Sequence, residues 1–362
     1  MNNFEEIFFT LLKSALWGTP ACLQCTISKE EWNSIYNISK EQTVSGIMLD
    51  AIAMLPQSQR PHSTLLIKWI VLQEAIKKSN IAMNMVLVGL IQDLNSKNIQ
   101  AYVLKGQGLA QNYPHPTHRV CGDIDLYFKE KDFDRAVDFF SSAGCEIEGN
   151  PNETHYETLY KGIKLELHKK STTFFTNRLQ EKYNSTTAAI LKEETDREFA
   201  TIDGHSVEIL PYTANALQQL SHMLRHIITA GLGLRQVCDW VLYTNKYLND
   251  SNKEQFLSNI KELELLQTYK VISAIATDYL GLPREKVACE INKSDKKLAK
   301  KVFTIIMNYG NFGHYGRHSQ KATFLDYIRT FTWKFKNCIR LRKLAKSETR
   351  NYLLWKYHFI DD

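Results

Sequence analysis

The amino-acid sequence predicts an α+β protein, with a small mixed β-sheet between large N- and C-terminal helical regions. Apolar residues recur at helical spacing near both ends of the chain. Between residues 100 and 209, short runs of β-forming residues alternate with helical segments, which is typical of α/β and α+β domains. We therefore expect an N-terminal helical region over 1–78, a sheet-bearing domain over 79–212 and a C-terminal helical domain over 213–362.

The first 78 residues are predicted to be mainly helical. Apolar side chains recur at helical spacing over 4–12 and again over 47–55. Between these segments, Ser28 is expected to cap a helix, with Glu31 at the position where a capping box has an acid. A long helix is predicted over 66–95.

The middle of the chain holds six predicted strands, and a helix over 131–143 separates the second strand from the third. The strands are expected over 100–104, 123–128, 145–148, 155–160, 163–168 and 206–209. Beyond them, Thr213 is expected to cap a helix that the Gly231-Leu232-Gly233 turn ends. Further helices are predicted from about 234, over 253–280 and over 294–309.

The composition is typical of an ordinary globular protein. The 362 residues are 44% hydrophobic and 23% charged, which excludes a disordered chain. No apolar run approaches the roughly 20 residues needed to span a bilayer, and the acidic N-terminus shows no secretory signal. The seven cysteines are odd in number and mostly isolated, which suits reduced thiols. We expect a cytoplasmic protein with no membrane span.

Positive charge gathers near the C-terminus. The net charge of +6 suits a protein that handles triphosphates and does not by itself indicate nucleic-acid binding. Basic residues alternate there with apolar ones at helical spacing: Lys334, Lys336, Arg340, Arg342, Lys343, Lys346 and Arg350. Such a helix can meet RNA, an anionic membrane or the protein's own core, and a solvated basic face is the simplest interpretation.

The stretch Gly122-Asp123-Ile124-Asp125 carries the strongest functional signal. Two carboxylates separated by one apolar residue in a strand point to the same face. Like charges at that spacing repel, and burying them unpaired is costly, so a divalent cation is the simplest partner. Hard cations such as Mg²⁺ prefer oxygen ligands and share coordination with phosphates.

Two neighbouring segments support this interpretation. Lys105-Gly106-Gln107-Gly108 follows the first strand, and its glycines let backbone N–H groups approach a phosphate while Lys105 adds positive charge. In the strand 163–168, Lys164, Glu166 and His168 share a face, so Glu166 is the expected third carboxylate. Glu157 on the preceding strand is the lower-ranked alternative, since its strand alternates less cleanly.

These motifs resemble the nucleotidyltransferase superfamily, with its DNA polymerase β-like fold, and most closely a family of largely uncharacterised bacterial nucleotidyltransferases. The likeness covers roughly residues 80–245. The family combines a Leu-Lys-Gly turn, an Arg before Gly-Asp-x-Asp-Leu, and a later Glu-Leu-His. The matching residues here are Leu104-Lys105-Gly106, Arg119, Gly122-Asp123-Ile124-Asp125-Leu126 and Glu166-Leu167-His168. Many superfamily members have Gly-Ser or Gly-Gly in the phosphate-gripping turn, so which backbone groups grip the triphosphate here stays open.

The resemblance implies a metal-dependent enzyme that transfers a nucleoside monophosphate from an NTP, such as ATP, to an acceptor. Asp123, Asp125 and Glu166 would be catalytic and would hold Mg²⁺ or Mn²⁺ in a two-metal arrangement. The residues expected to bind the nucleotide are Lys105, Gly106, Arg119, Gly122 and Arg235. The acceptor is a small molecule or a macromolecule that the sequence does not identify, and nucleic acid is compatible but not required.

Several alternatives stay open. Arg119 either binds phosphate or pairs with Asp123, and Arg235 either reaches the triphosphate or pairs with Asp239 four residues on. The acids could also belong to a non-catalytic nucleotide- or RNA-binding regulatory protein, although keeping all three acids favours an enzyme. A weaker alternative is a zinc hydrolase that uses three histidines: His168, His222 and His226.

Overall fold

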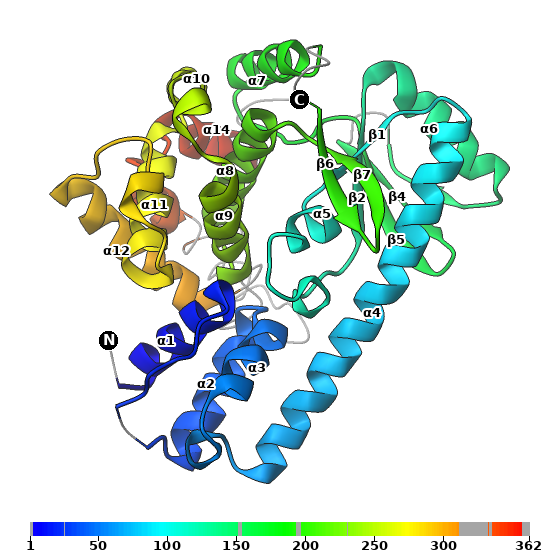
Figure 1. Ribbon diagram of the computed structural model, residues 1–362. Coiled ribbons are helices and arrows are strands. Elements are labelled where there is room, and N and C mark those ends of the chain that lie inside the picture. The colour runs from blue at the N-terminus through cyan, green and yellow to red at the C-terminus, as the bar shows by residue number, and fades with distance from the viewer. Residues whose placement is uncertain are drawn as a thin grey trace. The chain divides into compact units, whose positions relative to one another are not determined.

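The computed structural model describes residues 3–24, 26–150, 154–192, 197–229, 231–310, 332 and 335–356. It confirms the mixed α+β class, with helical regions before and after one seven-stranded sheet (Figure 1). The chain forms two compact units. The first comprises Met1–Lys40, Val44–Thr172 and Ile190–Asn215, and the second comprises Glu41–Thr43, Thr173–Ala189 and Ala216–Asp362. The three-domain division stays a prediction.

In the part of the chain that the structure describes, four α-helices precede the sheet, and the predicted capping box is present at the second. Their bounds are α1 (Asn3–Trp17), α2 (Lys29–Glu41), α3 (Ser45–Met54) and α4 (Ser63–Ser96). Ser28 N–H donates to Glu31 Oε2 at 2.8 Å, and Glu31 N–H donates to Ser28 Oγ at 3.2 Å. This reciprocal pair satisfies two N–H groups that the first helical turn leaves without helical partners.

Helix α3 lies against α4 and against the turn Pro116–His118. Trp69 Nε1 of α4 donates to Ser45 O at 2.8 Å, and Gln73 Nε2 donates to Gly46 O at 2.7 Å. A Cβ at Gly46 would lie 2.0 Å from the carbonyl oxygen of His118, so only glycine permits this approach.

The seven strands form one sheet in the order β3-β4-β5-β2-β1-β7-β6. Their bounds are β1 (Ala101–Leu104), β2 (Ile124–Phe128), β3 (Ile147–Glu148), β4 (His155–Tyr160), β5 (Ile163–His168), β6 (Glu198–Ile202) and β7 (His205–Ile209). All six predicted strands are confirmed to within two residues, whereas β6 was missed. In the centre, β2 pairs antiparallel with β1 and parallel with β5.

The main core covers one face of the sheet. Ile124, Leu126 and Phe128 of β2 are fully buried there, together with side chains of α4 and of α6 (Glu130–Ser142). A smaller cluster, which includes Tyr102 and Leu104 of β1, lies on the other face. Because strand side chains alternate, the odd-numbered positions of β2 lie on the face away from this main core.

The remaining elements are mostly helices. They are α5 (Gly106–Ala110), α7 (Asn177–Ile190), α8 (Tyr212–Thr229), α9 (Leu234–Tyr247), α10 (Asp250–Glu262), α11 (Leu266–Leu280), α12 (Lys293–Tyr309) and α14 (Lys346–Lys356), with 3₁₀ turns at Gln57–Gln59, Pro116–His118 and Arg284–Lys286. The span predicted over 253–280 is two helices. The predicted basic C-terminal helix is interrupted, because residues 335–341 and Lys346–Lys356 are helical but 342–345, which include Arg342 and Lys343, are not; Lys334 lies outside the described residues.

The expected role of Thr213 as a helix cap is wrong. Tyr212 is already helical, and its N–H donates to the side-chain Oε1 of Glu198 at 2.8 Å. A carboxylate on β6 therefore satisfies a donor at the start of α8.

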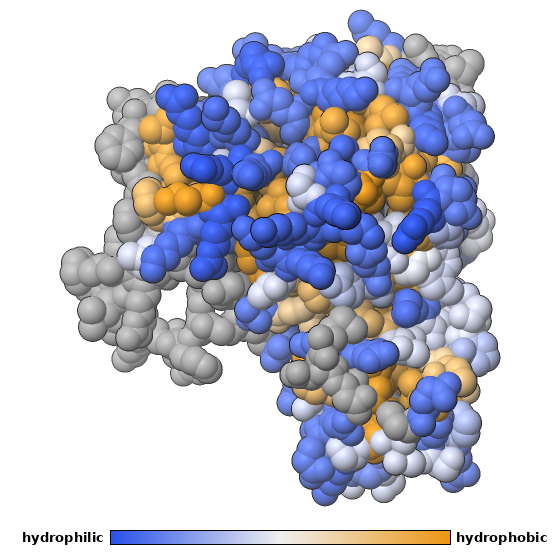
Figure 2. Space-filling model, turned by 90° about the vertical axis from the view of Figure 1, so that its left-hand side faces the viewer, coloured by the Kyte–Doolittle hydropathy of each residue, from blue (hydrophilic) through white to orange (hydrophobic). Residues whose placement is uncertain are grey.

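Among the described residues, no helix is long and apolar enough to cross a bilayer. Figure 2 shows one face, on which hydrophilic side chains surround smaller hydrophobic areas.

Candidate metal and nucleotide site

Two of the three predicted carboxylates lie side by side on neighbouring strands. The parallel register of β2 and β5 pairs Asp125 with Glu166, so both side chains share the face away from the main core. Asp125 is buried, with 4% of its surface exposed, and Glu166 is half-buried. Asp123 is half-buried and immediately precedes β2. The structure thus brings Asp125 and Glu166 together as the sequence predicts, with Asp123 two residues before Asp125.

Two cationic side chains contact the buried carboxylate. Lys105 Nζ lies 3.2 Å from Asp125 Oδ1, and His168 Nε2 lies 2.9 Å from the same oxygen. The same His168 nitrogen lies 3.2 Å from Glu166 Oε2. Lys105 and His168 thus bring positive charge to the carboxylates for which the sequence predicts a divalent cation.

The pKa shifts follow from these contacts. Burial by itself raises the pKa of the Asp125 carboxyl, but the Lys105 ammonium and the hydrogen bond and charge of His168 hold this pKa well below its ordinary range. Burial by itself lowers the pKa of His168, but hydrogen bonds to Asp125 and Glu166 outweigh it and raise this pKa above its ordinary value. Asp125 is therefore ionised, and His168 holds its proton more tightly than an ordinary imidazole.

The turn after β1 has an unusual backbone. Lys105 has φ +44° and ψ −138°, and Gly106 has φ +35°. A left-handed φ is costly for lysine, and such strain gathers at binding sites. A Cβ at Gly108 would lie 3.2 Å from Ile209 Cγ2, so the turn packs closely on β7. Since Leu104 pairs with Asp125 in the sheet, this geometry places Lys105 next to the acidic strand.

His155, which the sequence pattern did not single out, joins this group. The antiparallel register of β4 and β5 pairs His155 with His168, and their ring centroids are 5.1 Å apart. One ligand atom each from His155, Glu166 and His168 lie within 4.8 Å of one another. Imidazole ligands favour transition metals such as Zn²⁺, whereas carboxylate oxygens such as those of Asp123, Asp125 and Glu166 suit Mg²⁺ or Mn²⁺.

Glu157, the alternative third acid, occupies a different environment. It pairs with Glu166 in the register of β4 and β5, but its Oε2 lies 2.7 Å from Lys164 Nζ. The hydrogen bond from Lys164 lowers the pKa of the Glu157 carboxyl, and its side chain is 39% exposed. Glu157 thus forms a surface ion pair with Lys164, and its Oε1 lies 3.7 Å from His155 Nε2, whereas Glu166 contacts His168 beside Asp125.

The predicted phosphate-binding residues are placed as follows. Arg119 is 4% exposed, and its Nη1 donates to Val120 O at 3.2 Å and lies 3.1 Å from Cys121 Sγ. A Cβ at Gly122 would meet no atom within 4 Å, so this position faces open space. Arg235 is the second residue of α9 and belongs to the second unit. Their roles toward a nucleotide stay predictions.

The histidines of the alternative zinc site also lie in two units. His222 and His226 belong to α8 in the second unit, and their Nε2 atoms are 2.8 Å apart. His168 belongs to the first unit and contacts Asp125. A zinc site made from all three stays a prediction.

Comparison with known proteins gives two matches. Residues 28–281, more than half of the 362-residue chain, match the model of a family described as uncharacterised nucleotidyltransferase. A solved structure, an antigenic nucleotidyltransferase-like protein from Paracoccidioides brasiliensis, is 14% identical, with a TM-score of 0.32 and a match covering 50% of this chain and 91% of that one. No curated protein matches the chain.

Proposed function

This chain belongs to the family of uncharacterised nucleotidyltransferases, and from its acidic site we propose that it transfers a nucleoside monophosphate from an NTP to a nucleophilic acceptor. One observation carries the proposal. Asp125 and Glu166 are in register on parallel strands, and the strained Lys105 at the end of β1 contacts Asp125 at 3.2 Å. Neighbouring carboxylates can bind metal ions, and the Lys105–Gly108 turn beside them can bind phosphate oxygens, so the two together suit a metal-bound triphosphate.

The donor set fits divalent cations. Asp125 is buried yet ionised, and Lys105 and His168 contact its Oδ1. The three carboxylates of the proposed set outnumber these two cationic side chains, and a metal ion that binds Asp125 Oδ1 would take the place of one of these contacts. Asp123, Asp125 and Glu166 would hold Mg²⁺ or Mn²⁺, which prefer carboxylate oxygens. When bound, a pair of such ions supplies charge stabilisation for the attacking and leaving oxygens of an in-line displacement.

The chain's own residues would divide the remaining tasks. Lys105 would offset the charge that develops on the phosphates, and Arg119 would bind phosphate oxygens in the same way. Glu166 would lie toward the acceptor and help to activate its hydroxyl or other nucleophile. His168, which contacts both Asp125 and Glu166, would hold the two carboxylates in position. Gly122 leaves open space beside Asp123.

The test is transfer of label from the α-phosphate of each of the four NTPs into cell-extract fractions, with Mg²⁺ or Mn²⁺. The wild type is compared with the double variant Asp123→Asn/Asp125→Asn. We expect a labelled product only with the wild type, and its size identifies the class of acceptor. No transfer by the wild type, with NTP binding equal in the two proteins, contradicts the proposal and favours a non-catalytic nucleotide-binding protein.

A further inference from the structure

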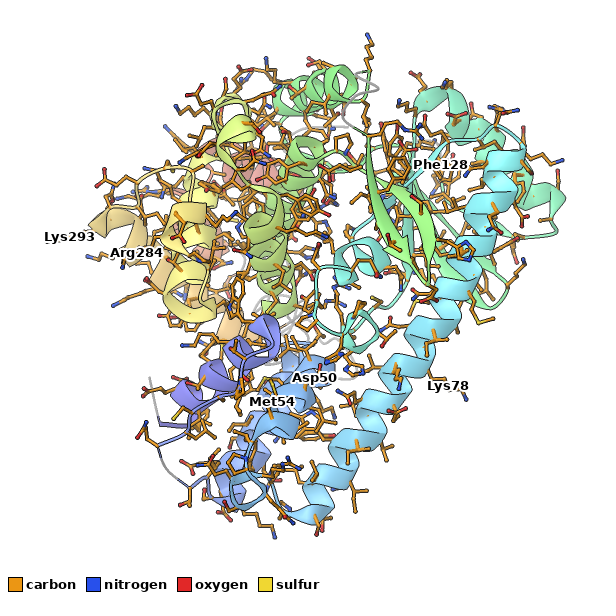
Figure 3. The ribbon with its side chains drawn as sticks, in the orientation of Figure 1. Asp50, Met54, Lys78, Phe128, Arg284 and Lys293 are labelled. Carbon is orange, nitrogen blue, oxygen red and sulfur yellow. The ribbon has the colours of Figure 1, made fainter. Side chains whose placement is uncertain are left out.

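One face of the long helix α4 exposes apolar side chains to water. Ile67 is 60% exposed, Val71 65%, Ile81 40% and Met85 70%. Lys78 lies on the side of α4 that faces away from Asp50 and Met54 of α3 (Figure 3). A helix that covers a core normally carries polar residues on its outer face, so an exposed apolar stripe marks an interaction surface.

The stripe has the spacing of a coiled-coil seam. We define the α4 seam as Ile67, Val71, Glu74, Lys78, Ile81 and Met85. Successive members are separated by four, three, four, three and four residues, which is the alternation of a and d positions in a heptad repeat. At 1.5 Å per residue, the seam spans about 27 Å. The small Ala75 beside it lines a shallow depression with Glu74, Lys77, Lys78 and Ile81.

The seam is also self-complementary about residue 76. In an antiparallel pair of α4 helices, Ile67 meets the partner's Met85, and Val71 meets the partner's Ile81. At the centre, Glu74 meets the partner's Lys78, and the two-fold axis repeats this ion pair. A parallel pair would instead place Glu74 against the partner's Glu74, which is repulsive. A two-fold interface requires self-complementarity of this kind, and central polar residues set the orientation of paired helices.

We propose that α4 pairs antiparallel with α4 of a second copy of this chain and makes a two-fold dimer along the α4 seam. Glu74 can exchange its present partner for Lys78 of a second copy, because its ion pair with Lys77 of the same helix is exposed and 3.7 Å long, and such pairs contribute little stability. The opposite face of α4, including Leu87, Leu90 and Leu94, packs in the main core. Asp125 lies on the other side of the sheet from that core, so the dimer leaves the acidic face accessible.

Sedimentation equilibrium of the full chain tests the dimer. We expect the wild type to dimerise and Val71→Asp to be monomeric with an unchanged circular dichroism spectrum. Glu74→Lys or Lys78→Glu alone should weaken dimerisation at least about tenfold, because like charges then meet at the centre. The double variant Glu74→Lys/Lys78→Glu should restore it. A monomeric wild type, or a dimer indifferent to all these changes, overturns the proposal.

Disulfide trapping tests the orientation. Mixing Ile67→Cys protein with Met85→Cys protein should give a cross-linked dimer, while neither variant should cross-link alone, because like positions lie about 27 Å apart along the seam. The unmodified chain, run in parallel, measures the background from native thiols such as the exposed Cys22. Cross-linking of each variant with itself indicates a parallel pair and overturns the antiparallel assignment.

Discussion

Replacing Asp125 by asparagine tests the charge arrangement around β2. Its Oδ1 lies 3.2 Å from Lys105 Nζ and 2.9 Å from His168 Nε2, and the residue is 4% exposed. Asparagine has nearly the same size and keeps one acceptor oxygen, but it removes the negative charge. Two cations then face a neutral amide, and the folded state loses stability.

The expected loss is moderate. Breaking a buried ion pair costs about 3–5 kcal/mol when the remaining charge stays buried. Here the Lys105 side chain is 22% exposed, and His168 can release its proton or keep its contact with Glu166 at 3.2 Å. A hydrogen bond to a charged group contributes about 1.5–3 kcal/mol, so we expect a loss of about 2 kcal/mol at pH 7.

Urea denaturation of the metal-free protein, with EDTA present, measures this loss as a function of pH. Because the folded-state pKa of Asp125 lies well below its ordinary 3.8, its stabilising contribution is fully present above pH 3.8. The contribution disappears as the pH falls through the folded-state pKa, so the gap between wild type and Asp125→Asn should shrink on acidification. Equal stability at pH 7, or a gap that does not depend on pH, would refute the reasoning.

Three further predictions concern other positions. Gly46→Ala should lower the free energy of unfolding by at least about 2 kcal/mol, because the new Cβ would lie 2.0 Å from His118 O. Gly89→Ala, whose new Cβ would meet no atom within 4 Å, should raise the free energy of unfolding by about 0.5–1 kcal/mol. Urea denaturation compares the two variants. In metal-free protein, NMR should show His168 titrating above its ordinary 6.5, so its stabilising contribution is full below pH 6.5 and lost as the pH rises through the folded-state pKa. Adding Mg²⁺ and NTP should lower that pKa, and no change would place the metal elsewhere. Ser28→Ala should cost about 1 kcal/mol by removing one half of the capping box, which thermal unfolding measures, and an unchanged midpoint would contradict this role.

Local pattern was sufficient where a residue's partner is close in sequence. The strands predicted over 155–160 and 163–168 have the same bounds as β4 and β5. The spacing of Ser28 and Glu31, three residues apart, predicted the capping box whose two hydrogen bonds the structure contains. For Asp125 and Glu166, 41 residues apart, alternation predicted only the face on which each lies, and the resemblance to the nucleotidyltransferase motifs supplied the expectation that they share one site.

Other features depend on partners that a local pattern does not reveal. β6 directly follows a polar stretch, and the Asp203-Gly204 turn after it, with both φ values positive, was the overlooked hairpin signal. Tyr212 begins α8 because Glu198 on β6 accepts from its N–H, so Thr213 is not the cap. His155 could have been found by counting back from the β4–β5 turn, since the register pairs it with His168.

The strained backbone of Lys105 was beyond sequence reasoning. Its φ of +44° is set by the packing of the following turn against β7 and by the register of β1 with β2. A lysine with that φ is energetically costly. The sequence does not show that residue 105 is placed so that its Nζ contacts Asp125, because this contact depends on the assembled sheet.

The most direct test of the proposed transfer compares two glutamates that face each other in the sheet. Glu157 and Glu166 are paired in the register of β4 and β5, but only Glu166 contacts His168 beside Asp125. In the α-phosphate transfer assay, Glu166→Gln should lose at least about 100-fold in rate, as expected for a group that acts in proton transfer. Glu157→Gln should keep near wild-type activity. Equal losses in the two variants, or full activity of Glu166→Gln, would contradict the assignment of the acidic site.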